Sequence, residues 1–524
     1  MLARAQSFTI QGLEARQVTV EVDIHIGLPT FNVIGLADPA VREARDRVRA
    51  AILNSGFRFP SGRITANLAP SDIPKVGAGL DLALACAVLA ASDQIPKRPL
   101  GNLALFGELA LDGQVRACQG TLAVAEATAR VGLGTLVVSG ERAQEATLVE
   151  GLRVAVAECL RSATRIVGGG MSDRPRQQTN GTPTIVGPER EPDLSDVRGR
   201  EHAVRALMVA AAGAHNLLMC GPPGVGKTML AKRLPSILPP LSRAEAIEVT
   251  RIHSVAGRLQ HHGDLVRRRP FRAPHHTATT AGLVGGASQG CVGEVVLAHN
   301  GVLFLDELSE FSRQAIEALR QPLEDGRVAI VRARHAAVYP ARFMLVAATN
   351  PCPCGYAGVA ERCQCSEADL ARYRRKLSGP LLDRIDLLVQ VGPAGRAVER
   401  AGRSPGAGGV AGHHHRTITS LEARAAVGLA RDRQLSRYRE EGFAANAHVD
   451  TSTLRRTVRL EPQGEMALRE AHRRGILSTR GVHRVLRLAR TVADLAGSDR
   501  VGLAHVAEAL AFSPTPELAG RRAA

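Results

Sequence analysis

The chain has 524 residues, of which 45% are hydrophobic and 22% charged, so it is long enough for two or three packed domains and lacks the composition of a disordered chain. No segment approaches the roughly 18 uninterrupted apolar residues of a membrane span, and the first residues contain no apolar signal core, so we expect a cytoplasmic protein without membrane contact. The net charge of +17 would attract polyanions such as nucleic acid, although an arginine-solvated surface explains it equally well.

The N-terminal part, residues 1–166, alternates strand-like and helical segments. VTVEVDIHI, from Val18, has the period-2 alternation of a strand, and PAVREARDRVRAAILNSG, from Pro39, is an amphipathic helix that ends at a glycine. GRITANLAP, from Gly62, is a second strand. This pattern predicts a mixed α/β domain. Residues 167–192, rich in Gly, Pro and polar side chains, have the composition of a linker.

A second unit, residues 193–392, alternates helices with the apolar strands NLLMC, GVLFLDE and FMLVAATN. Strands this apolar indicate a sheet covered on both faces, as in α/β proteins. A Gly-rich insertion at 393–416 follows. The patterns LEARAAVGLARDRQLSRYREEG and VHRVLRLARTVADLAG then predict a helical region over 417–524. The expected fold class is therefore α/β with a helical C-terminal part.

A phosphate-binding motif lies between the first of these strands and a helix. GPPGVGKT satisfies the P-loop pattern, follows NLLMC and precedes the predicted helix MLAKRLPSI. Its glycines let backbone N–H groups face phosphate oxygens, Lys227 would reach the β- and γ-phosphates, and Thr228 would offer its hydroxyl to Mg²⁺. The predicted ATP-binding residues are Gly221, Pro222, Pro223, Gly224, Val225, Gly226, Lys227 and Thr228.

The other two apolar strands end in polar residues: Asp306 and Glu307 follow one, and Asn350 ends the other. Ligands of α/β sheets bind at the carboxyl ends of the strands. We expect Asp306 to hold Mg²⁺ through water and Glu307 to orient or deprotonate the water that attacks the γ-phosphate. Asn350 would hold that water or sense the γ-phosphate. Each position taken singly fits a structural strand end, but their combination with a P-loop favours catalysis.

Four of the nine cysteines lie in NPCPCGYAGVAERCQCS, whereas the others are scattered singly, as in a protein of a reducing compartment. Cys352, Cys354, Cys363 and Cys365 could form a tetrahedral structural Zn²⁺ site that pins a loop with almost no hydrophobic core of its own. The Cys-x-x-Cys spacing of common zinc ribbons is absent, so a loop with reduced thiols remains the alternative.

Beyond the P-loop, the sequence resembles AAA+ ATPases, and more narrowly the magnesium-chelatase-like branch that includes the YifB and ComM proteins. The matching segments span about residues 195–495 and read GPPGVGKT, FRAPHHTAT, AHNGVLFLDELSEF, LRQPLEDG, AATNPCPCG, SGPLLDRID and STRGVHRVLRLARTVADL. This resemblance implies an AAA+ core followed by a helical lid. It also implies a homo-oligomeric ring, usually hexameric, in which ATP lies between subunits.

In such a ring each subunit completes its neighbour's site. By resemblance, Arg384 in LLDRID is expected to be the arginine finger and Arg480 in STR the second sensor of the lid, with Arg484 as the competitor to Arg480. A planar cation suits the charge that grows on the phosphoryl oxygens. His275 and His276, in APHHTAT, form either a structural turn or a contact to substrate in the ring pore.

The N-terminal domain resembles the Lon protease fold found in YifB and ComM proteins, through ITANLAPSDIPKVGAGLDLALACAVLAASDQI and GELALDGQVRACQG. In an active Lon-type domain a Ser nucleophile follows Pro-Lys, and a Lys follows the later glycine. Here Gly79 stands near the Ser position, and no Lys follows Gly120 within reach. A Ser–Lys dyad is therefore absent, and the domain is expected to bind DNA or a partner, or to stiffen the ring.

The resemblance suggests a DNA motor, namely a branch-migration helicase that acts on single-stranded or branched DNA in recombination during natural transformation. The basic charge agrees, and with only 3% aromatic residues we expect backbone tracking rather than base stacking. The alternative is an ATPase that remodels a protein partner, chelatase-type or chaperone-like, without DNA. Chelatase ATPase subunits typically lack the Lon-like domain, which counts against the chelatase type.

Overall fold

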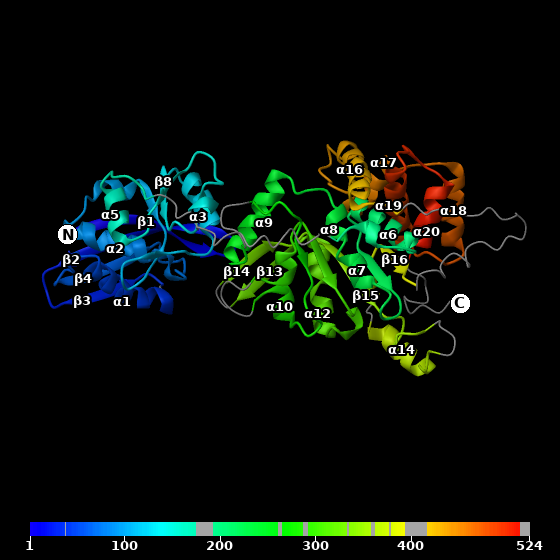
Figure 1. Ribbon diagram of the computed structural model, residues 1–524, viewed down its shortest axis with the longest axis horizontal. Coiled ribbons are helices and arrows are strands. Elements are labelled where there is room, and N and C mark those ends of the chain that lie inside the picture. The colour runs from blue at the N-terminus through cyan, green and yellow to red at the C-terminus, as the bar shows by residue number, and fades with distance from the viewer. Residues whose placement is uncertain are drawn as a thin grey trace, which may run out of the picture.

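The computed structural model places three parts of the chain in a row: an N-terminal α/β part, a central parallel sheet and a C-terminal group of helices (Figure 1). It describes residues 1–36, 38–173, 192–259, 265–286, 292–332, 335–357, 362–376, 379–392 and 417–513. Most of the predicted linker at 167–192 and all of the predicted insertion at 393–416 lie outside these ranges. Within them, no helix is long and apolar enough to cross a membrane.

The N-terminal part contains a seven-stranded mixed sheet in the order β3-β4-β2-β1-β5-β8-β9. β1 and β2 form a long antiparallel hairpin, β4 pairs antiparallel with β2, and the other neighbours pair in parallel. The strands are β1 (Leu2–Gln11), β2 (Glu14–His25), β3 (Thr30–Ile34), β4 (Arg63–Ala69), β5 (Leu103–Leu105), β8 (Thr135–Val138) and β9 (Arg153–Val156), with a small hairpin of β6 (Glu108–Leu109) and β7 (Val115–Arg116). The helices are α1 (Pro39–Asn54), α2 (Asp81–Ala91), α3 (Thr121–Arg130), α4 (Ala143–Ala146) and α5 (Leu160–Val167). The predicted strands from Val18 and Gly62 and the predicted helix from Pro39 are confirmed.

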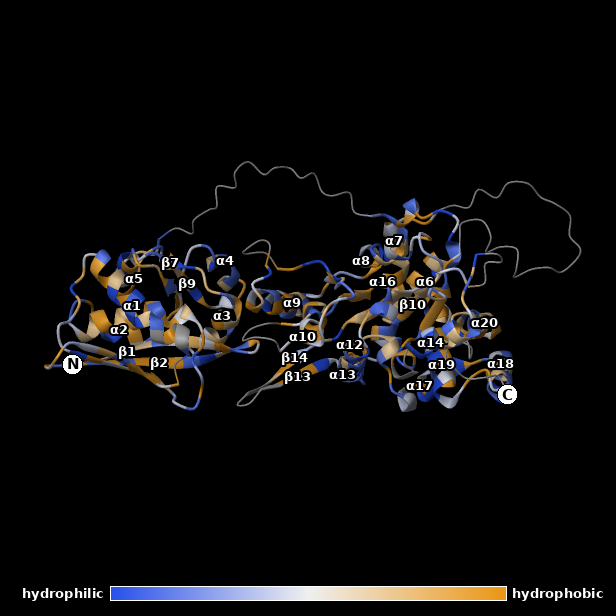
Figure 2. Ribbon diagram, turned by 90° about the horizontal axis from the view of Figure 1, so that it is seen from below, coloured by the Kyte–Doolittle hydropathy of each residue, from blue (hydrophilic) through white to orange (hydrophobic). Residues whose placement is uncertain are grey.

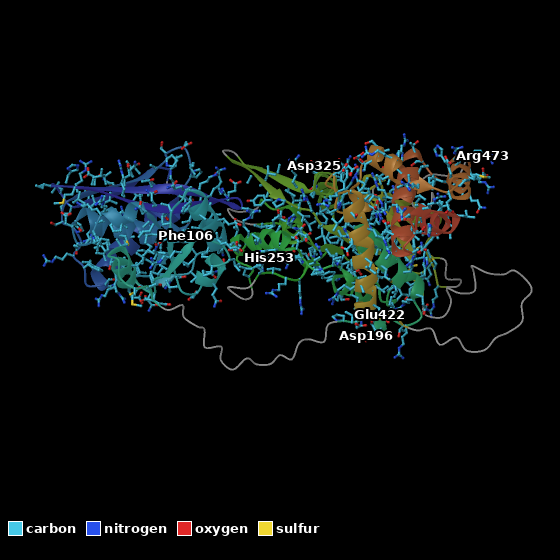
Figure 3. The ribbon with its side chains drawn as sticks, turned by 90° about the horizontal axis from the view of Figure 1, so that it is seen from above. Phe106, Asp196, His253, Asp325, Glu422 and Arg473 are labelled. Atoms are coloured by element: carbon cyan, nitrogen blue, oxygen red, sulfur yellow. The ribbon has the colours of Figure 1, made fainter. Side chains whose placement is uncertain are left out.

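The turn before α2 is tightly packed. Every residue of α2 is buried, and a Cβ built on Gly79 would lie 2.4 Å from the ring of Phe106. Phe106, marked in Figure 3, is itself buried in the N-terminal part. The ring therefore fills the space that a side chain at position 79 would need, so a serine could be accommodated there only if Phe106 moved.

The central part contains a five-stranded, wholly parallel sheet in the order β11-β12-β15-β10-β16. Its strands are β10 (Leu217–Cys220), β11 (Phe271–Arg272), β12 (Val302–Leu305), β15 (Met344–Thr349) and β16 (Leu387–Gln390). Every residue of β10, β12 and β15 is buried, which confirms the predicted parallel sheet covered on both faces. The remaining elements are α6 (Glu201–Gly213), α7 (Lys227–Ala231), α8 (Leu234–Ile237), α9 (Arg243–Val255), α10 (Thr280–Val284), α11 (Glu294–Leu297), α12 (Arg313–Ala318), α13 (Arg320–Asp325), α14 (Glu367–Lys376), α15 (Gly379–Leu382) and the hairpin of β13 (Arg327–Arg332) and β14 (His335–Pro340).

The helix predicted after the P-loop is broken in two, so the expectation of one continuous helix is wrong. α7 ends at Ala231 and α8 begins at Leu234, with Pro235 in its first turn. A proline has no N–H to donate to the carbonyl four residues earlier, which here belongs to Ala231. Pro235 therefore accounts for the break between α7 and α8.

The C-terminal helices share one core with the central sheet and α6. They are α16 (Ser420–Arg437), α17 (Thr451–Thr457), α18 (Pro462–Arg473), α19 (Thr479–Leu495) and α20 (Leu503–Ala511), with a two-residue parallel pair of β17 (Arg459–Leu460) and β18 (Arg500–Val501). The two helical patterns predicted in this region correspond to α16 and α19. Figure 2 shows hydrophobic residues on strands and helices in all parts of the molecule, in agreement with the apolar cores.

A second core joins the N-terminal part to the central part through α9. The Ser254 hydroxyl donates to the buried Glu145 carboxylate at 2.7 Å, the Gly120 N–H donates to the Ser254 carbonyl at 3.2 Å, and Arg251 pairs with Glu126 at 3.2 Å. His253, on the same helix, is marked in Figure 3. The two parts are thus packed together along α9.

Candidate active site

The P-loop takes the conformation that its glycines permit. β10 ends at Cys220, Gly224 and Gly226 have φ of +76° and +82°, and α7 begins at Lys227. Positive φ is readily adopted by glycine and is strained for other residues. Gly221 is close-packed, because a Cβ there would lie 2.1 Å from the Val391 carbonyl oxygen. The loop therefore connects strand and helix by the sharp turn that the motif predicts.

The Lys227 ammonium connects the P-loop to the end of β15. Its Nζ donates to the Gly221 carbonyl at 2.6 Å, the Pro222 carbonyl at 2.9 Å and Asn350 Oδ1 at 3.0 Å. Burial lowers the pKa of Lys227, with nearby Asp306 acting in the opposite direction. The structure thus brings Lys227 and Asn350, which are 123 residues apart, into direct contact.

Thr228 and Asp306 also meet. The Thr228 hydroxyl donates to Asp306 Oδ2 at 2.6 Å, and Asp306 Oδ1 accepts from the Glu307 N–H at 3.0 Å. A hydroxyl and a carboxylate provide the hard oxygen donors that Mg²⁺ prefers. These two predicted Mg²⁺ ligands are therefore adjacent at the carboxyl ends of β10 and β12.

Glu307 differs from Asp306 in conformation and exposure. Its φ is +52°, a left-handed value that is uncommon for a residue other than glycine, and its side chain is 54% exposed. Glu307 Oε2 lies 3.7 Å from His276 Nδ1. The backbone turns Glu307 out of the strand while Asp306 stays next to Thr228.

Tyr373, on α14, is a residue that sequence reasoning missed. Its buried hydroxyl lies 3.0 Å from Ser309 Oγ, 3.1 Å from Thr349 Oγ1 and 3.0 Å from the Asn350 carbonyl oxygen. Burial raises the pKa of this phenol, so it remains a neutral hydroxyl. α14 thereby supports the chain at the end of β15 and just after β12. The sequence carries only a weak signal for this role, namely a tyrosine among the arginines in the second half of the helix EADLARYRRK.

The predicted arginine residues form a separate group. Arg384 pairs with Glu324, Arg480 lies 3.7 Å from Asp383, and Arg484 donates to the Asp383 carbonyl at 3.3 Å. Arg480 therefore lies beside Asp383, the residue that precedes Arg384 in the chain. Within the described residues, none of their hydrogen bonds or ion pairs reaches the P-loop.

The four clustered cysteines converge as the Zn²⁺ prediction requires. Their sulfur atoms all lie within 4.8 Å of one another, with Cys352 Sγ at 3.2 Å from Cys354 Sγ and 3.9 Å from Cys363 Sγ. The members of the group are Cys352, Cys354, Cys363 and Cys365. Four thiolates this close match the ligand set of a closed tetrahedral zinc site.

The cysteine loop also touches the P-loop. A Cβ built on Gly355 would lie 2.7 Å from Pro223 Cδ, so the two loops are in close contact at these positions. Gly355 has φ of +86°, which suits the turn between the first two cysteines and the rest of the loop. A change in the conformation of the cysteine loop would therefore alter the packing against Pro223 in the P-loop.

The P-loop follows β10, which lies between β15 and β16 in the five-stranded parallel sheet. The amide of Asn350 follows the neighbouring strand β15, and the acidic side chains follow β12 on the far side of β15. This arrangement defines an ATPase of the AAA+ class. Residues 193–398 match the family described as "Magnesium chelatase, subunit ChlI", residues 20–142 match "Subunit ChlI of Mg-chelatase", and residues 417–513 match "Magnesium chelatase, subunit ChlI C-terminal".

Similar proteins match along nearly the whole chain. The competence protein ComM of Haemophilus influenzae is 40% identical over 98% of this chain and 97% of its own, and YifB of Escherichia coli is 40% identical over 96% and 95%. An uncharacterized protein of Mycobacterium tuberculosis is 46% identical over 98% and 99%. The chain therefore belongs to the YifB and ComM family of magnesium-chelatase-like proteins. A shorter match, 34% identical over 41% of this chain and 54% of its own, is the Holliday junction branch migration complex subunit RuvB of Paenarthrobacter aurescens.

Proposed function

We propose that this protein is a Mg²⁺-dependent AAA+ ATPase that assembles into a hexameric ring and acts as a DNA motor, a branch-migration helicase in recombination during natural transformation. The observation that carries the ATPase chemistry is the convergence of Lys227 with Asn350 and of Thr228 with Asp306 at the carboxyl ends of β10, β12 and β15. Four residues from three strand ends, with the chemistry of phosphate and metal binding, are grouped at one edge of the sheet.

In this proposal the loop of residues 221–228 binds the phosphates of ATP with its backbone N–H groups, and Lys227 contacts the β- and γ-phosphates. Thr228 and Asp306 supply oxygen ligands to Mg²⁺, which neutralises phosphate charge when bound. Glu307 accepts a proton from the attacking water or orients it. Asn350, held by Lys227, contacts the same water or the γ-phosphate.

The ring explains the position of the arginine group. Since Arg384 and Arg480 make their contacts around Asp383 and Glu324 rather than at the P-loop, we infer that Arg384 acts as an arginine finger toward the ATP of a neighbouring subunit. We assign Arg480 as the second sensor of the lid, which residues 417–524 would form. The N-terminal residues 1–166 would be a Lon-protease-like domain without the Ser–Lys dyad, and residues 193–392 the ATPase core.

The DNA role rests on charge and on relatives. A net charge of +17 favours a polyanionic track, and the similar proteins include one named for competence and one named for branch migration. The described cysteines are all free, which fits the cytoplasm, where DNA is found. We infer that the ring follows the phosphate backbone of single-stranded or branched DNA.

A second candidate, remodelling of a protein partner without DNA, is favoured by one surface of the N-terminal domain. Ile26, Leu28, Ile34 and Leu36 have exposed fractions of 105%, 85%, 51% and 53%. Apolar side chains gathered on one short segment suit contact with protein, either a partner or a neighbouring subunit.

The test that separates the two is ATP hydrolysis by the full chain with no DNA, single-stranded DNA, duplex and a four-way junction, at two salt concentrations, beside a Lys227→Ala control. Stimulation by single-stranded or branched DNA that fades with salt and vanishes in the control supports the motor. Robust hydrolysis that ignores every DNA contradicts the motor and favours a protein partner.

We also propose that Cys352, Cys354, Cys363 and Cys365 hold a structural Zn²⁺ ion. The convergence of four sulfur atoms on one point supports this, and the loop they close has few apolar residues to stabilise it otherwise. With four protein ligands the site has no open position, so a catalytic role for the ion is not expected. Metal analysis of the purified protein distinguishes zinc from reduced thiols.

A further inference from the structure

The segment FRAPHH runs beside the strand that carries the acidic pair. β11 pairs in parallel with β12, with Phe271 opposite Val302 and Arg272 opposite Leu303, a constant offset of 31 residues. The paired residues end at Arg272, and Pro274 follows two positions later. Four residues beyond Arg272, His276 Nδ1 lies 3.7 Å from Glu307 Oε2.

The strand before His276 is firmly anchored. Arg272 makes a two-pronged ion pair with Glu294, with N–O distances of 2.6 and 2.8 Å, and the Phe271 ring stacks on Phe304 with centroids 5.9 Å apart. A two-pronged pair between planar groups fixes orientation as well as distance. The strand β11, which precedes His276 in the chain, is therefore fixed relative to β12.

His276 itself is held by its own turn. The Ala278 N–H donates to the His275 carbonyl at 2.9 Å, and the rings of His275 and His276 are in contact at a tilt of 33°, with centroids 4.1 Å apart. His275 bonds through Nδ1 to the Thr277 hydroxyl at 2.9 Å. The side chain of His276 is 35% exposed, so it is partly enclosed where it faces Glu307.

Glu307, by contrast, needs support from outside its own strand. Its left-handed backbone carries it away from β12, and its side chain is more exposed than that of His276, at 54%. A carboxylate that serves as a base must keep one geometry relative to the attacking water, and an exposed side chain with several free torsions does not do so unaided.

We propose that His276 is a positioning residue for Glu307. Its Nδ1, which lies 3.7 Å from Oε2 here, comes within hydrogen-bonding distance of Oε2 when ATP is bound, and this leaves Oε1 for the attacking water. This inference rests on the proposed role of Glu307 as the base. It gives the FRAPHH segment a function that the motif alone does not indicate, because the position of this edge segment then decides whether the base is aligned.

The test compares the full-length variants His276→Ala, His276→Asn and His275→Ala. Asn keeps an N–H donor near the position of Nδ1, whereas Ala does not. We expect His276→Ala to lower kcat about tenfold while KM and the Kd for ATP stay within about twofold, because a positioning group contributes only part of the effect of a general base. His276→Asn should recover most of kcat, and His275→Ala, which removes the neighbouring ring but keeps the His276 side chain, should lower kcat less than His276→Ala does.

Three results would overturn the inference: an unchanged or raised kcat in His276→Ala, a drop that appears equally in ATP binding, or a loss that Asn does not recover. The variant Glu307→Gln separates this failure from that of the proposed function. If Glu307→Gln hydrolyses ATP like the wild type, the role of Glu307 is wrong. If Glu307→Gln is inactive while His276→Ala is fully active, only the positioning role is wrong.

Discussion

Replacing Tyr373 by Phe removes one hydroxyl and leaves the ring, so it isolates the polar contacts between α14 and the carboxyl ends of β12 and β15. That hydroxyl has three partners at 3.0–3.1 Å, namely Ser309 Oγ, Thr349 Oγ1 and the Asn350 carbonyl oxygen. A hydrogen bond contributes about 0.5–1.5 kcal/mol net, and a buried group left unpaired costs about 1–3 kcal/mol. Since the Thr349 hydroxyl also reaches the Asn350 carbonyl, at 3.3 Å, part of the loss is compensated, and we expect a destabilisation of about 2 kcal/mol.

The assay is thermal unfolding beside steady-state ATP hydrolysis. For a cooperative folding unit of about 250 residues, a destabilisation of about 2 kcal/mol corresponds to a fall in Tm of roughly 4 °C. kcat should also fall, because the backbone that orients Asn350 loses a support, whereas KM should change little. Tyr356→Phe is the matched control, since that ring lies in the same region and is contacted by Arg362 over its face, at 5.7 Å. If Tyr373→Phe and Tyr356→Phe have the same Tm and hydrolyse ATP at the same rate, the Tyr373 hydroxyl does not support the site.

Three further predictions concern the phosphate loop, the cysteines and pH. Lys227→Ala should reduce phosphate release from ATP by at least about 10²-fold without unfolding the protein, and retained hydrolysis would contradict the P-loop assignment. Elemental analysis should find about one zinc ion per chain, lost in Cys352→Ser and kept in Cys118→Ser; no zinc in the wild type would favour reduced thiols. Burial lowers the pKa of His299, against the opposing pull of Glu248, and His299 Nδ1 accepts the Arg342 N–H at 3.1 Å, which requires the neutral ring. As pH falls, the unfolded state therefore binds a proton at His299 before the folded state does. The stability that neutral His299 contributes to the folded state is present above about pH 6.5 and is lost as pH falls toward the lower folded pKa. Tm measured from pH 7.5 to 5 should fall in the wild type and fall less in His299→Gln.

The grouping of the polar strand ends with the P-loop could be predicted because each lies in a short segment whose chemistry and flanking pattern agree. GPPGVGKT sits between an apolar strand and a helix, and the structure places Lys227 and Thr228 next to the polar ends of the other two strands. The break between α7 and α8 could have been predicted as well, since Pro235 is visible, but the apolar pattern of MLAKRLPSI conceals it.

Contacts between segments that lie far apart in the chain could not be predicted, because no local sequence pattern connects them. Tyr373 acts through three partners drawn from two strand ends, and the helix EADLARYRRK gives no more than a weak signal that this residue faces inward. His276 was open to two interpretations because its neighbour Glu307 lies 31 residues further on, and only the pairing of β11 with β12 brings the two together. Register between strands depends on the whole sheet, so it cannot be read from either segment alone.

The packing of α9 bears on what the N-terminal domain does. On one side the Ser254 hydroxyl of this helix donates to Glu145 of the N-terminal domain, inside a shared apolar core. On the other side His253 bonds to the Leu297 carbonyl at 3.2 Å, and Glu248 pairs with His299 at 3.1 Å, both just before the strand that carries Asp306. A domain attached only by a linker could move without affecting that strand, but one that shares α9 with it cannot. Of the roles considered for this domain, stiffening the ATPase therefore fits the packing better than free capture of a partner, because movement of the domain would also move the segment before β12.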